Sequence, residues 1–455
     1  MKKANIIIFL VLIASGCNFD ENKTSTSNNS QTHHDQNRMA TTLSASESEP
    51  GNLGWMQGFP PPKEKRLSAH DGSFFQFPAL RYSVVRMREF MPTTNVSRGS
   101  TVATLFSYQI DNQIDSVKFI PWDQEQPMTW SASLLKNYTD GIIVLHKGVV
   151  VYEKYFADLN ETRVHAVMSL TKSFTGTLAS ILVAEGLIDV NKRVKDYIPE
   201  LAESAFGDAT LRQVMDMTTG LKYSENYADP NAEVWAFSAA GNPLPKPKDY
   251  TGPVGYYEYL QTVKKEGEHG QAFGYKTVNS DALGWVIARA SGKSVASLLE
   301  EKIWTQLGME QDSYFQIDAL GTPFAGGGFN AGLRDLARFG ELIRRKGKWQ
   351  NQQLIPEQAV LDIEKGGSKE AFAKSNYAKL SGWSYRNMWW ITHNEHGAFA
   401  ARGVHGQTIY IDPTAEMVIV RLASHPVAGN AANDPFSLPA YHAVANYLIN
   451  KANSE

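Results

Sequence analysis

The sequence predicts an α/β fold in which a mainly antiparallel sheet is flanked by helices and carries an inserted helical subdomain. Two observations support this class. β-Rich segments stand near both ends of the region with globular composition, and helical patterns fill the stretch between them. The turns inside each strand pair are short, and short connections join antiparallel neighbours. We therefore expect one sheet that is assembled from both parts of the chain.

The first strands are expected at residues 140–146 and 149–156, two β-rich runs that are separated by a Lys-Gly turn signal. A helix is expected at 170–185, where small and apolar residues occupy nearly every side. That composition is typical of a buried helix rather than a surface one. Gly186 suits the C-terminal cap of this helix.

The remaining elements follow in two groups. A helical insert is expected from about residue 190 to about 335, and the chain then returns to strands at 407–411 and 417–422. The helices expected inside the insert are 194–201, 211–217, 254–265, 280–290 and 295–307. Those expected outside it are 335–345, 356–363 and 438–451.

Residues 1–17 have the pattern of a lipoprotein-type signal peptide. Two lysines precede a short apolar run, and Ala-Ser-Gly then leads to Cys17, the only cysteine in the chain. The pattern resembles the lipobox of bacterial lipoproteins, which implies lipidation of Cys17 and an extracytoplasmic, lipid-anchored protein on a bacterial membrane. Cleavage by the general signal peptidase and an ordinary buried or free cysteine are the alternatives.

The rest of the chain divides by composition. Residues 18–60 are polar and read as a disordered tether. Residues 61–130 form an N-terminal extension that is expected to pack on the main domain, residues 131–455. The net charge is −3 and no basic stripe stands out, so we expect no nucleic-acid partner.

Ser169 and Lys172 are the leading candidates for chemistry. They stand three residues apart where the buried helix begins, so they share one helical face. A buried lysine has a lowered pKa and can accept a proton from a nearby serine. A second Ser-x-x-Lys copy, Ser133 and Lys136, lies in a plain amphipathic segment, and there we expect the lysine to be solvated.

Two downstream motifs complete a resemblance. Tyr275 and Thr277 precede an apolar helix, and a turn that contains Gly406 precedes a strand. In this order the motifs resemble the serine β-lactamase-like, penicillin-recognising hydrolases, and most closely the class C-like branch that contains 6-aminohexanoate-dimer hydrolases. The stretches that carry the closer resemblance are 168–173, 225–230, 334–338, 389–390 and 404–407.

The resemblance implies a serine hydrolase domain over residues 131–455 that acts on a small-molecule amide or ester. Ser169 would form an acyl-enzyme, while Lys172 and Tyr275 would share the proton transfers, with the choice of base left open. The backbone N–H groups of Ser169 and Gln407 would form the oxyanion hole. No metal or organic cofactor is implied.

Two departures from the β-lactamase pattern limit the classes of substrate that fit this sequence. Thr277 stands where that pattern has asparagine, and Val404 stands where it has a lysine that helps to bind carboxylates. An amidase or esterase for other linear acyl groups therefore fits better. A carboxylesterase or β-lactamase of the same family, and a non-catalytic cell-wall-binding protein on the same fold, are the alternatives.

Several residues have both a substrate-binding and a structural interpretation. Tyr227, Thr277, His405 and Trp390 are candidates for substrate contact, with packing as the alternative for Tyr227 and His405, and Gly406 would let a substrate approach the strand edge. One ring of the pair Trp389 and Trp390 is expected to wall the site and the other to lie in the core. His393 and His396 share one loop, but without a third nearby ligand we expect no metal there.

Overall fold

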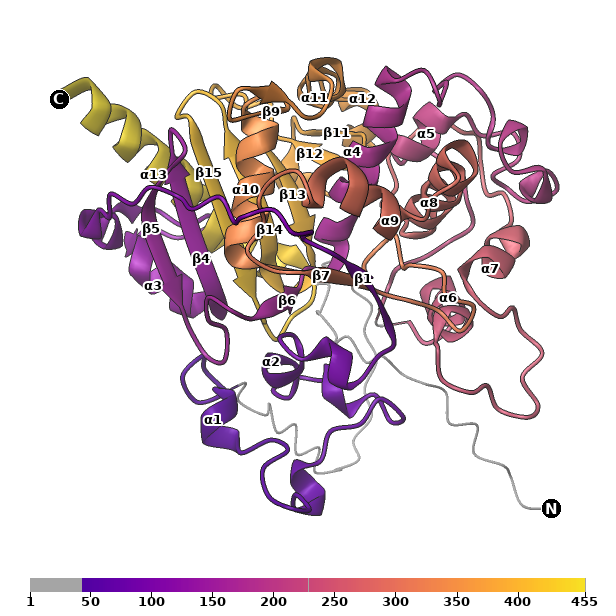
Figure 1. Ribbon diagram of the computed structural model, residues 1–455, viewed down its shortest axis with the longest axis horizontal. Helices are drawn as coiled ribbons and strands as arrows, with labels where there is room; N and C mark the ends of the chain where they lie inside the picture. The colour runs from indigo at the N-terminus through magenta and orange to yellow at the C-terminus, as the bar shows by residue number, and fades with distance from the viewer. Residues whose placement is uncertain (1–42, 228, 455) are drawn as a thin grey trace, which may run out of the picture.

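A seven-stranded antiparallel sheet in the order β11-β12-β13-β14-β15-β4-β5 organises the fold (Figure 1). The computed structural model describes residues 43–454 except residue 228. The strands of this sheet are β4 (Thr139–His146), β5 (Val149–Tyr155), β11 (Ser384–Arg386), β12 (Trp389–Ile391), β13 (Phe399–Gly403), β14 (Gln407–Asp412) and β15 (Met417–Ala423). Because β15 pairs with β4, the predicted sheet from both parts of the chain is confirmed.

Two helices cover opposite faces of this sheet. Ile409 of β14 faces Gly340 of α10 (Leu333–Arg344). The next residue, Tyr410, lies 5.3 Å from the ring of Tyr441 in α13 (Asp434–Ser454). Successive side chains of a strand point to opposite faces, so the sheet is a buried layer between α10 and α13.

A smaller four-stranded sheet has the order β1-β7-β8-β6, and its strand β6 ends just before Ser169. Its strands are β1 (Thr93–Val96), β6 (Val164–Ala166), β7 (Ser313–Gln316) and β8 (Phe329–Gly332). The prediction of a helical insert up to residue 335 is wrong at its C-terminal end, because β7 and β8 belong to this sheet. Two-stranded ribbons are formed by β2 (Lys118–Phe119) with β3 (Met128–Thr129) and by β9 (Lys348–Trp349) with β10 (Gln352–Gln353).

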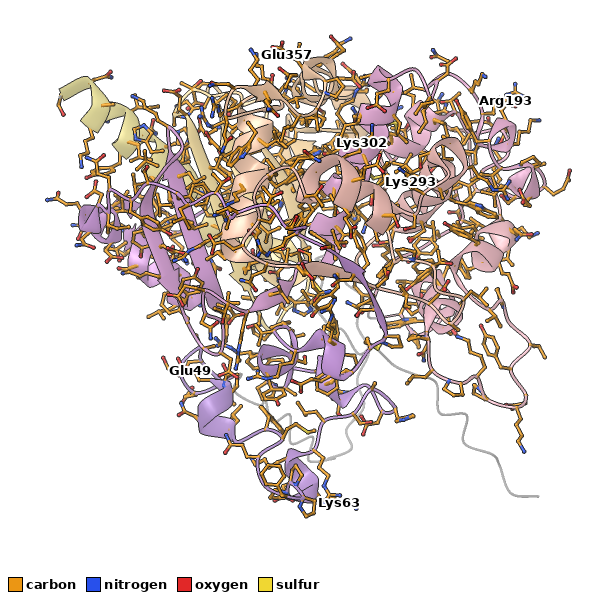
Figure 2. The ribbon with its side chains drawn as sticks, in the orientation of Figure 1. Glu49, Lys63, Arg193, Lys293, Lys302 and Glu357 are labelled. Carbon is orange, nitrogen blue, oxygen red and sulfur yellow. The ribbon has the colours of Figure 1, made fainter. Side chains whose placement is uncertain are left out.

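The helices between residues 211 and 299 lie beside the large sheet, and α8 and α9 of this group pack on α4 (Figure 1). Helix α4 is buried, as predicted. The helices of this group and those elsewhere are α1 (Pro50–Leu53), α2 (Leu80–Ser83), α3 (Trp130–Lys136), α4 (Thr171–Ala184), α5 (Leu211–Met215), α6 (Glu233–Gly241), α7 (Tyr256–Thr262), α8 (Val278–Ser291), α9 (Val295–Leu299), α11 (Glu357–Glu364) and α12 (Lys369–Ala373). Charged residues such as Arg193 and Glu357 lie on the outer surface (Figure 2). Among the described residues, no helix is both long and apolar enough to span a membrane.

Residues 194–201 do not form the predicted helix. They form two 3₁₀ turns, Val194–Asp196 and Pro199–Leu201. Proline lacks the backbone N–H donor and disfavours helical backbone at the residue before it, so Pro199 interrupts the helix. No sequence pattern predicted α6, α12 or β11 to β13. Strands β11 and β12 have three residues each, which is too few for a clear alternating pattern.

The predicted disordered tether ends too late. From residue 43 the chain packs on the domain, since Arg81 donates to the carbonyl of Ala45 at 2.7 Å and to Ser48 Oγ at 3.0 Å. The Tyr138 hydroxyl donates to the carbonyl of Leu43 at 2.7 Å. Hydrogen bonds to buried partners order this polar segment, which buries little apolar surface of its own. The predictions for residues 1–42, including Cys17, lie outside the described residues.

Candidate functional site

Ser169 occupies a 3₁₀ turn, Met168–Leu170, between β6 and the first residue of α4. Met168 has the left-handed φ of 50°, an uncommon conformation for a residue with a side chain. Met168 and Leu170 are buried on either side, while Ser169 remains partly exposed. The turn therefore holds the serine hydroxyl where an external molecule can reach it.

Lys172 lies in the first turn of α4 and points at the serine. Its Nζ lies 3.0 Å from Ser169 Oγ and donates to the carbonyl oxygen of Gly326 at 2.6 Å. The residue is only 1% exposed. Burial lowers the pKa of the Lys172 amine to about 8, although the nearby Glu225 and Asp281 carboxylates act in the opposite direction.

Two acidic side chains accompany this amine. Burial raises the pKa of Asp281, in the first turn of α8, to about 8, while Lys172 and the backbone N–H groups of Ala325 and Gly326 oppose that rise. Burial also raises the pKa of Glu225, and Lys172 is again the main opposing charge. The Lys172 amine therefore interacts with the Asp281 and Glu225 carboxyls and with the Gly326 carbonyl, next to Ser169.

Tyr275 reaches the same hydroxyl from the other side. It makes a hydrogen bond with Ser169, and its ring centroid lies 5.1 Å from Lys172 Nζ. Burial, and then the Glu225 charge, raise the pKa of the Tyr275 phenol well above its ordinary value. The phenol therefore keeps its proton at neutral pH. The structure brings together all three residues that the motifs predicted as the chemical centre.

Trp390 stands behind Tyr275. Its ring stacks on the Tyr275 ring with centroids 5.5 Å apart, and the Arg402 guanidinium lies 5.1 Å from its centroid. Arg402 is in turn paired with Asp434 at the start of α13. Trp390 is only 4% exposed, so it positions Tyr275 and offers little surface to a substrate. Trp389 is the core member of the pair, with its indole N–H donating to Thr177 Oγ1 at 3.2 Å.

Thr277 is tied to Glu225 and not turned to solvent. Its backbone N–H and its side chain both hydrogen-bond to the Glu225 carboxylate. A Cβ on Gly326 would meet the Thr277 methyl at 2.5 Å and the Asp281 carboxylate at 2.9 Å. Glycine at position 326 therefore lets the loop before β8 approach the start of α8 closely. In this position the Gly326 carbonyl also accepts the hydrogen bond from Lys172 of α4.

The end of strand β13 and the start of β14 pack against the turn that holds Ser169. A Cβ on Gly403 would lie 2.6 Å from the Val167 carbonyl oxygen, so this glycine permits the close approach. Gly406 has a φ of 96°, and its carbonyl accepts a bond from Arg421 Nε at 3.0 Å. The Gln407 side chain bonds across to Ala423 in β15, which fixes the start of β14 beside the Met168–Leu170 turn.

The other candidates divide between the two interpretations. His405 is buried, its Nδ1 bonds to the carbonyl of His425 at 2.7 Å, and burial lowers its pKa to about 4. These contacts favour the structural interpretation of His405. Tyr227 is partly exposed, its ring centroid lies 6.0 Å from that of Trp235, and burial raises the pKa of its phenol well above the ordinary value. It lies at the edge of the site, where contact with a substrate is feasible.

The second Ser-x-x-Lys copy does not form such a pair. Ser133 is buried and donates its hydroxyl to the Trp130 carbonyl at 2.7 Å. Lys136 is exposed, with its amine 5.3 Å from the centre of the Phe436 ring. Of the two copies, only Ser169 and Lys172 have the serine oxygen and the lysine amine within hydrogen-bond distance.

Sequence reasoning missed three members of the site. Glu225 falls in the resembling stretch 225–230 and Asp281 in the predicted helix 280–290, but neither pattern assigns them a role. Gly326 belongs to a run of three glycines that has no phosphate-loop context. A buried-looking acid in the first turn of an apolar helix was the one available signal, because an unpaired carboxylate there is costly.

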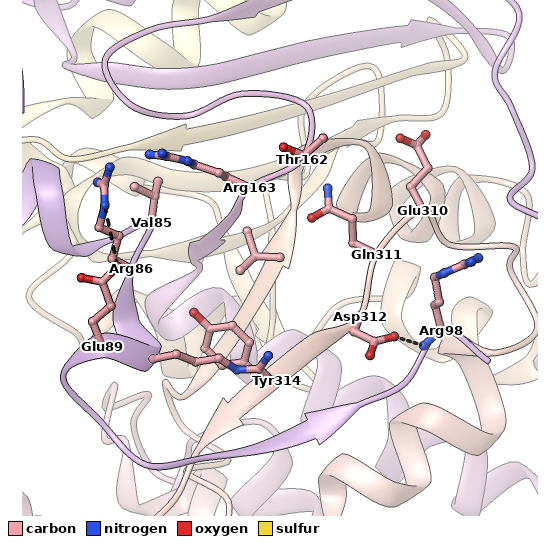
Figure 3. A pocket seen from close by; sticks show the side chains of 12 residues that line it. Val85, Arg86, Glu89, Arg98, Thr162, Arg163, Glu310, Gln311, Asp312 and Tyr314 are labelled. Carbon is pink, nitrogen blue, oxygen red and sulfur yellow. Dashed lines mark hydrogen bonds and ion pairs between the residues drawn. The ribbon is translucent and has the colours of Figure 1, made fainter. Parts of the chain in front are cut away.

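A separate hollow of about 650 Å³ is lined by residues of β6 and β7 and of the segments that flank β1 (Figure 3). Its lining includes Arg86, Arg98, Arg163 and Asp312, and the Arg98 backbone N–H donates to Asp312 at 2.8 Å. Neither Ser169 nor Lys172 lines it, so this hollow is not the site of the chemistry.

Comparisons with known proteins agree with the motifs. The family model described as Beta-lactamase matches residues 134–438. The 6-aminohexanoate-dimer hydrolase of Paenarthrobacter ureafaciens is 33% identical over 356 residues, which cover 78% of this chain and 88% of that protein.

Solved structures give the same result. One from Bacillus anthracis, assigned as a 6-aminohexanoate-dimer hydrolase, is 34% identical with a TM-score of 0.77, and the match covers 86% of this chain and 99% of that one. A penicillin-binding protein homologue from Pyrococcus abyssi has a TM-score of 0.52 at 20% identity over 70% of this chain and 75% of that one, which shows the fold alone. The resemblance inferred from the ordered motifs is confirmed: the chain belongs to the beta-lactamase family and is a serine hydrolase of amide or ester bonds.

Proposed function

We propose that Ser169 is the nucleophile of an acyl-enzyme reaction on linear amides or esters, with Lys172 as its general base. The observation that supports this most strongly is the 3.0 Å contact between Lys172 Nζ and Ser169 Oγ. A positioned base within hydrogen-bond reach of a hydroxyl is the requirement for activating it.

The directions of the two pKa shifts favour Lys172 over Tyr275 as the base. Burial lowers the pKa of Lys172 to about 8, so a useful fraction of the amine is neutral near pH 7 and can accept the serine proton. The pKa of Tyr275 is raised, so the phenolate form is scarce. Tyr275 then donates its proton to the leaving nitrogen or oxygen and recovers one from the Lys172 ammonium.

The backbone N–H groups of Ser169 and Gln407 are proposed to stabilise the oxyanion. They belong to the Met168–Leu170 turn and to the first residue of β14, which pack against one another. Fixed backbone donors that are aimed at developing negative charge need no reorganisation during the reaction. Water then attacks the acyl-enzyme carbonyl while Lys172 accepts its proton, and that proton passes to Ser169 Oγ as the bond between this oxygen and the acyl carbon breaks.

The proposed substrates are short linear amides with aliphatic chains, as the name of the 6-aminohexanoate-dimer hydrolase relatives suggests. Partly exposed Tyr227, Tyr275 and Tyr377 gather beside the nucleophile and suit methylene groups. Val404, in the turn after β13, supplies no charge for the carboxylate that a β-lactam carries next to its scissile amide. This favours linear amides over β-lactams.

Ser169→Ala is expected to lower kcat/KM for 6-aminohexanoate dimer and for p-nitrophenyl esters by about 10⁴-fold or more, because it removes the nucleophile. Ser133→Ala, in the second motif copy, is the matched control and should retain activity. A fluorophosphonate probe should add its mass to the peptide that contains Ser169 in the wild type and in the control. Unchanged hydrolysis by Ser169→Ala would contradict the proposal.

The dependence of kcat/KM on pH tests whether Lys172 is the general base. Since the neutral amine is the active form, kcat/KM should rise with pH and level off above an apparent pKa of about 8. The Asp281 carboxylate raises the pKa of Lys172, so Asp281→Asn should move the midpoint to lower pH. Glu301→Gln, which removes an exposed carboxylate, is the control. Identical profiles for all three proteins would rule out the role of Asp281.

We also propose that Cys17 carries a lipid that holds the enzyme on the extracytoplasmic side of a bacterial membrane. The support is the sequence pattern of two lysines, a short apolar run and Ala-Ser-Gly before the cysteine. The wild type, expressed in bacteria, should incorporate an alkyne-labelled fatty acid and partition into detergent, whereas Cys17→Ser should do neither. Equal partitioning without label in both proteins would contradict lipidation.

A further inference from the structure

We propose that Glu395, His396 and His442 form a binding site for a divalent transition-metal ion of the zinc class, remote from the serine. Glu395 and His396 lie in the loop between β12 and β13, and His442 lies in α13. One ligand atom from each of the three lies within 4.8 Å of the other two. The site thus joins the loop between two interior strands of the large sheet to the C-terminal helix.

The donor set matches this class of ion. His442 Nε2 and Glu395 Oε1 are already 3.2 Å apart, and the two imidazole rings lie 4.8 Å apart. Two imidazoles and one carboxylate are a usual protein ligand set for zinc, with water in the fourth position. Calcium and magnesium prefer sites that are built of oxygen ligands alone.

His396 is oriented as a metal ligand would be. Its Nδ1 bonds to Asp412 Oδ2 at 2.8 Å, and Asp412 is fully buried. The other Asp412 oxygen accepts the Ala415 backbone N–H at 2.9 Å, so the carboxylate cannot swing away without losing that bond. A carboxylate on one ring nitrogen fixes the tautomer and leaves the other nitrogen, Nε2, as an acceptor for an ion.

The loop that holds Glu395 and His396 is braced. Thr392 Oγ1 donates to the Ala398 carbonyl at 2.7 Å, and Asn394 Oδ1 accepts the Ala398 N–H at 2.9 Å. Thr414 donates to the His396 carbonyl at 3.0 Å. A loop that is already held in place loses little conformational entropy when an ion binds to it.

Zinc binding requires the three ligand atoms, which now lie within 4.8 Å of one another, to move closer together. The ligand atoms of a tetrahedral zinc site stand about 3.4 Å apart, given bond lengths of about 2.0–2.1 Å. The Glu395 and His442 side chains are 69% and 34% exposed and have room to rotate toward His396, which is 9% exposed and held by Asp412. His393, which was weighed with His396 as a metal pair, bonds instead to Ser384 Oγ at 2.7 Å.

The role that follows is stabilisation of the fold. The loop enters β13 at its first residue, whereas Gly403 at the other end of the strand packs against the serine turn. An ion that cross-links this loop to α13 binds the folded state in preference to the unfolded one and raises its stability. It takes no part in the proposed hydrolysis.

The test is calorimetric titration of the untagged protein with zinc chloride. One ion should bind per chain, and zinc at 100 times its Kd should raise Tm by about 3–5 °C. His442→Ala and Glu395→Gln should each weaken zinc binding by at least about 10-fold. His393→Ala, in the same loop but outside the cluster, is the control and should bind like the wild type.

Cobalt gives a second measurement that does not depend on stability. Bound Co²⁺ should show the intense visible bands of a four-coordinate site in the wild type and in His393→Ala, and these bands should be absent in His442→Ala. Glu395 is exposed, so Glu395→Gln tests the site without disturbing the core. No zinc uptake by the wild type, or equal uptake by His442→Ala, would overturn the proposal.

Discussion

The contact between the buried Lys172 amine and the Ser169 hydroxyl is the interaction around which the rest of the structure is arranged. A lysine amine inside a protein is stable only when its protonated form has partners or when it gives up its proton. Lys172 has both routes, since the Gly326 carbonyl accepts its N–H while burial lowers its pKa to about 8. Glu225 and Asp281 limit that shift, so the amine stays close to the pH at which a general base is most useful.

Holding that amine requires segments that are far apart in the sequence. The small sheet delivers the Met168–Leu170 turn through β6 and brings the loop of Gly326 up to it through β8. The large sheet presses Gly403 and Gln407 against the same turn. A cation–π and ion-pair chain from Asp434 through Arg402 to Trp390 then holds the Tyr275 ring in place. The two sheets and the start of α13 therefore all help to hold the serine turn, the Lys172 amine or the Tyr275 ring in place.

The limits of sequence reasoning follow from the range of each interaction. Ser169 and Lys172 could be predicted because their proximity is local, at one helical spacing, and the burial of α4 was legible in its composition. Asp281 and Gly326 could not, because their roles depend on α8 and the loop before β8 meeting at α4, which no local pattern encodes. The same holds for β11 to β13, whose pairing partners alone make such short segments into strands. His405 was ambiguous in sequence, and only the carbonyl of His425 beside it shows a structural role.

Direct titration of the Lys172 amine tests the central claim most closely. NMR of protein labelled with ¹³C at lysine Cε, with the Lys172 signal identified by its loss in Lys172→Arg, reports the pKa without reference to any substrate. Because burial lowers the pKa of this amine, we expect a midpoint of about 8. A midpoint near about 10.4, the ordinary value for a lysine, would contradict Lys172 as the base that activates Ser169.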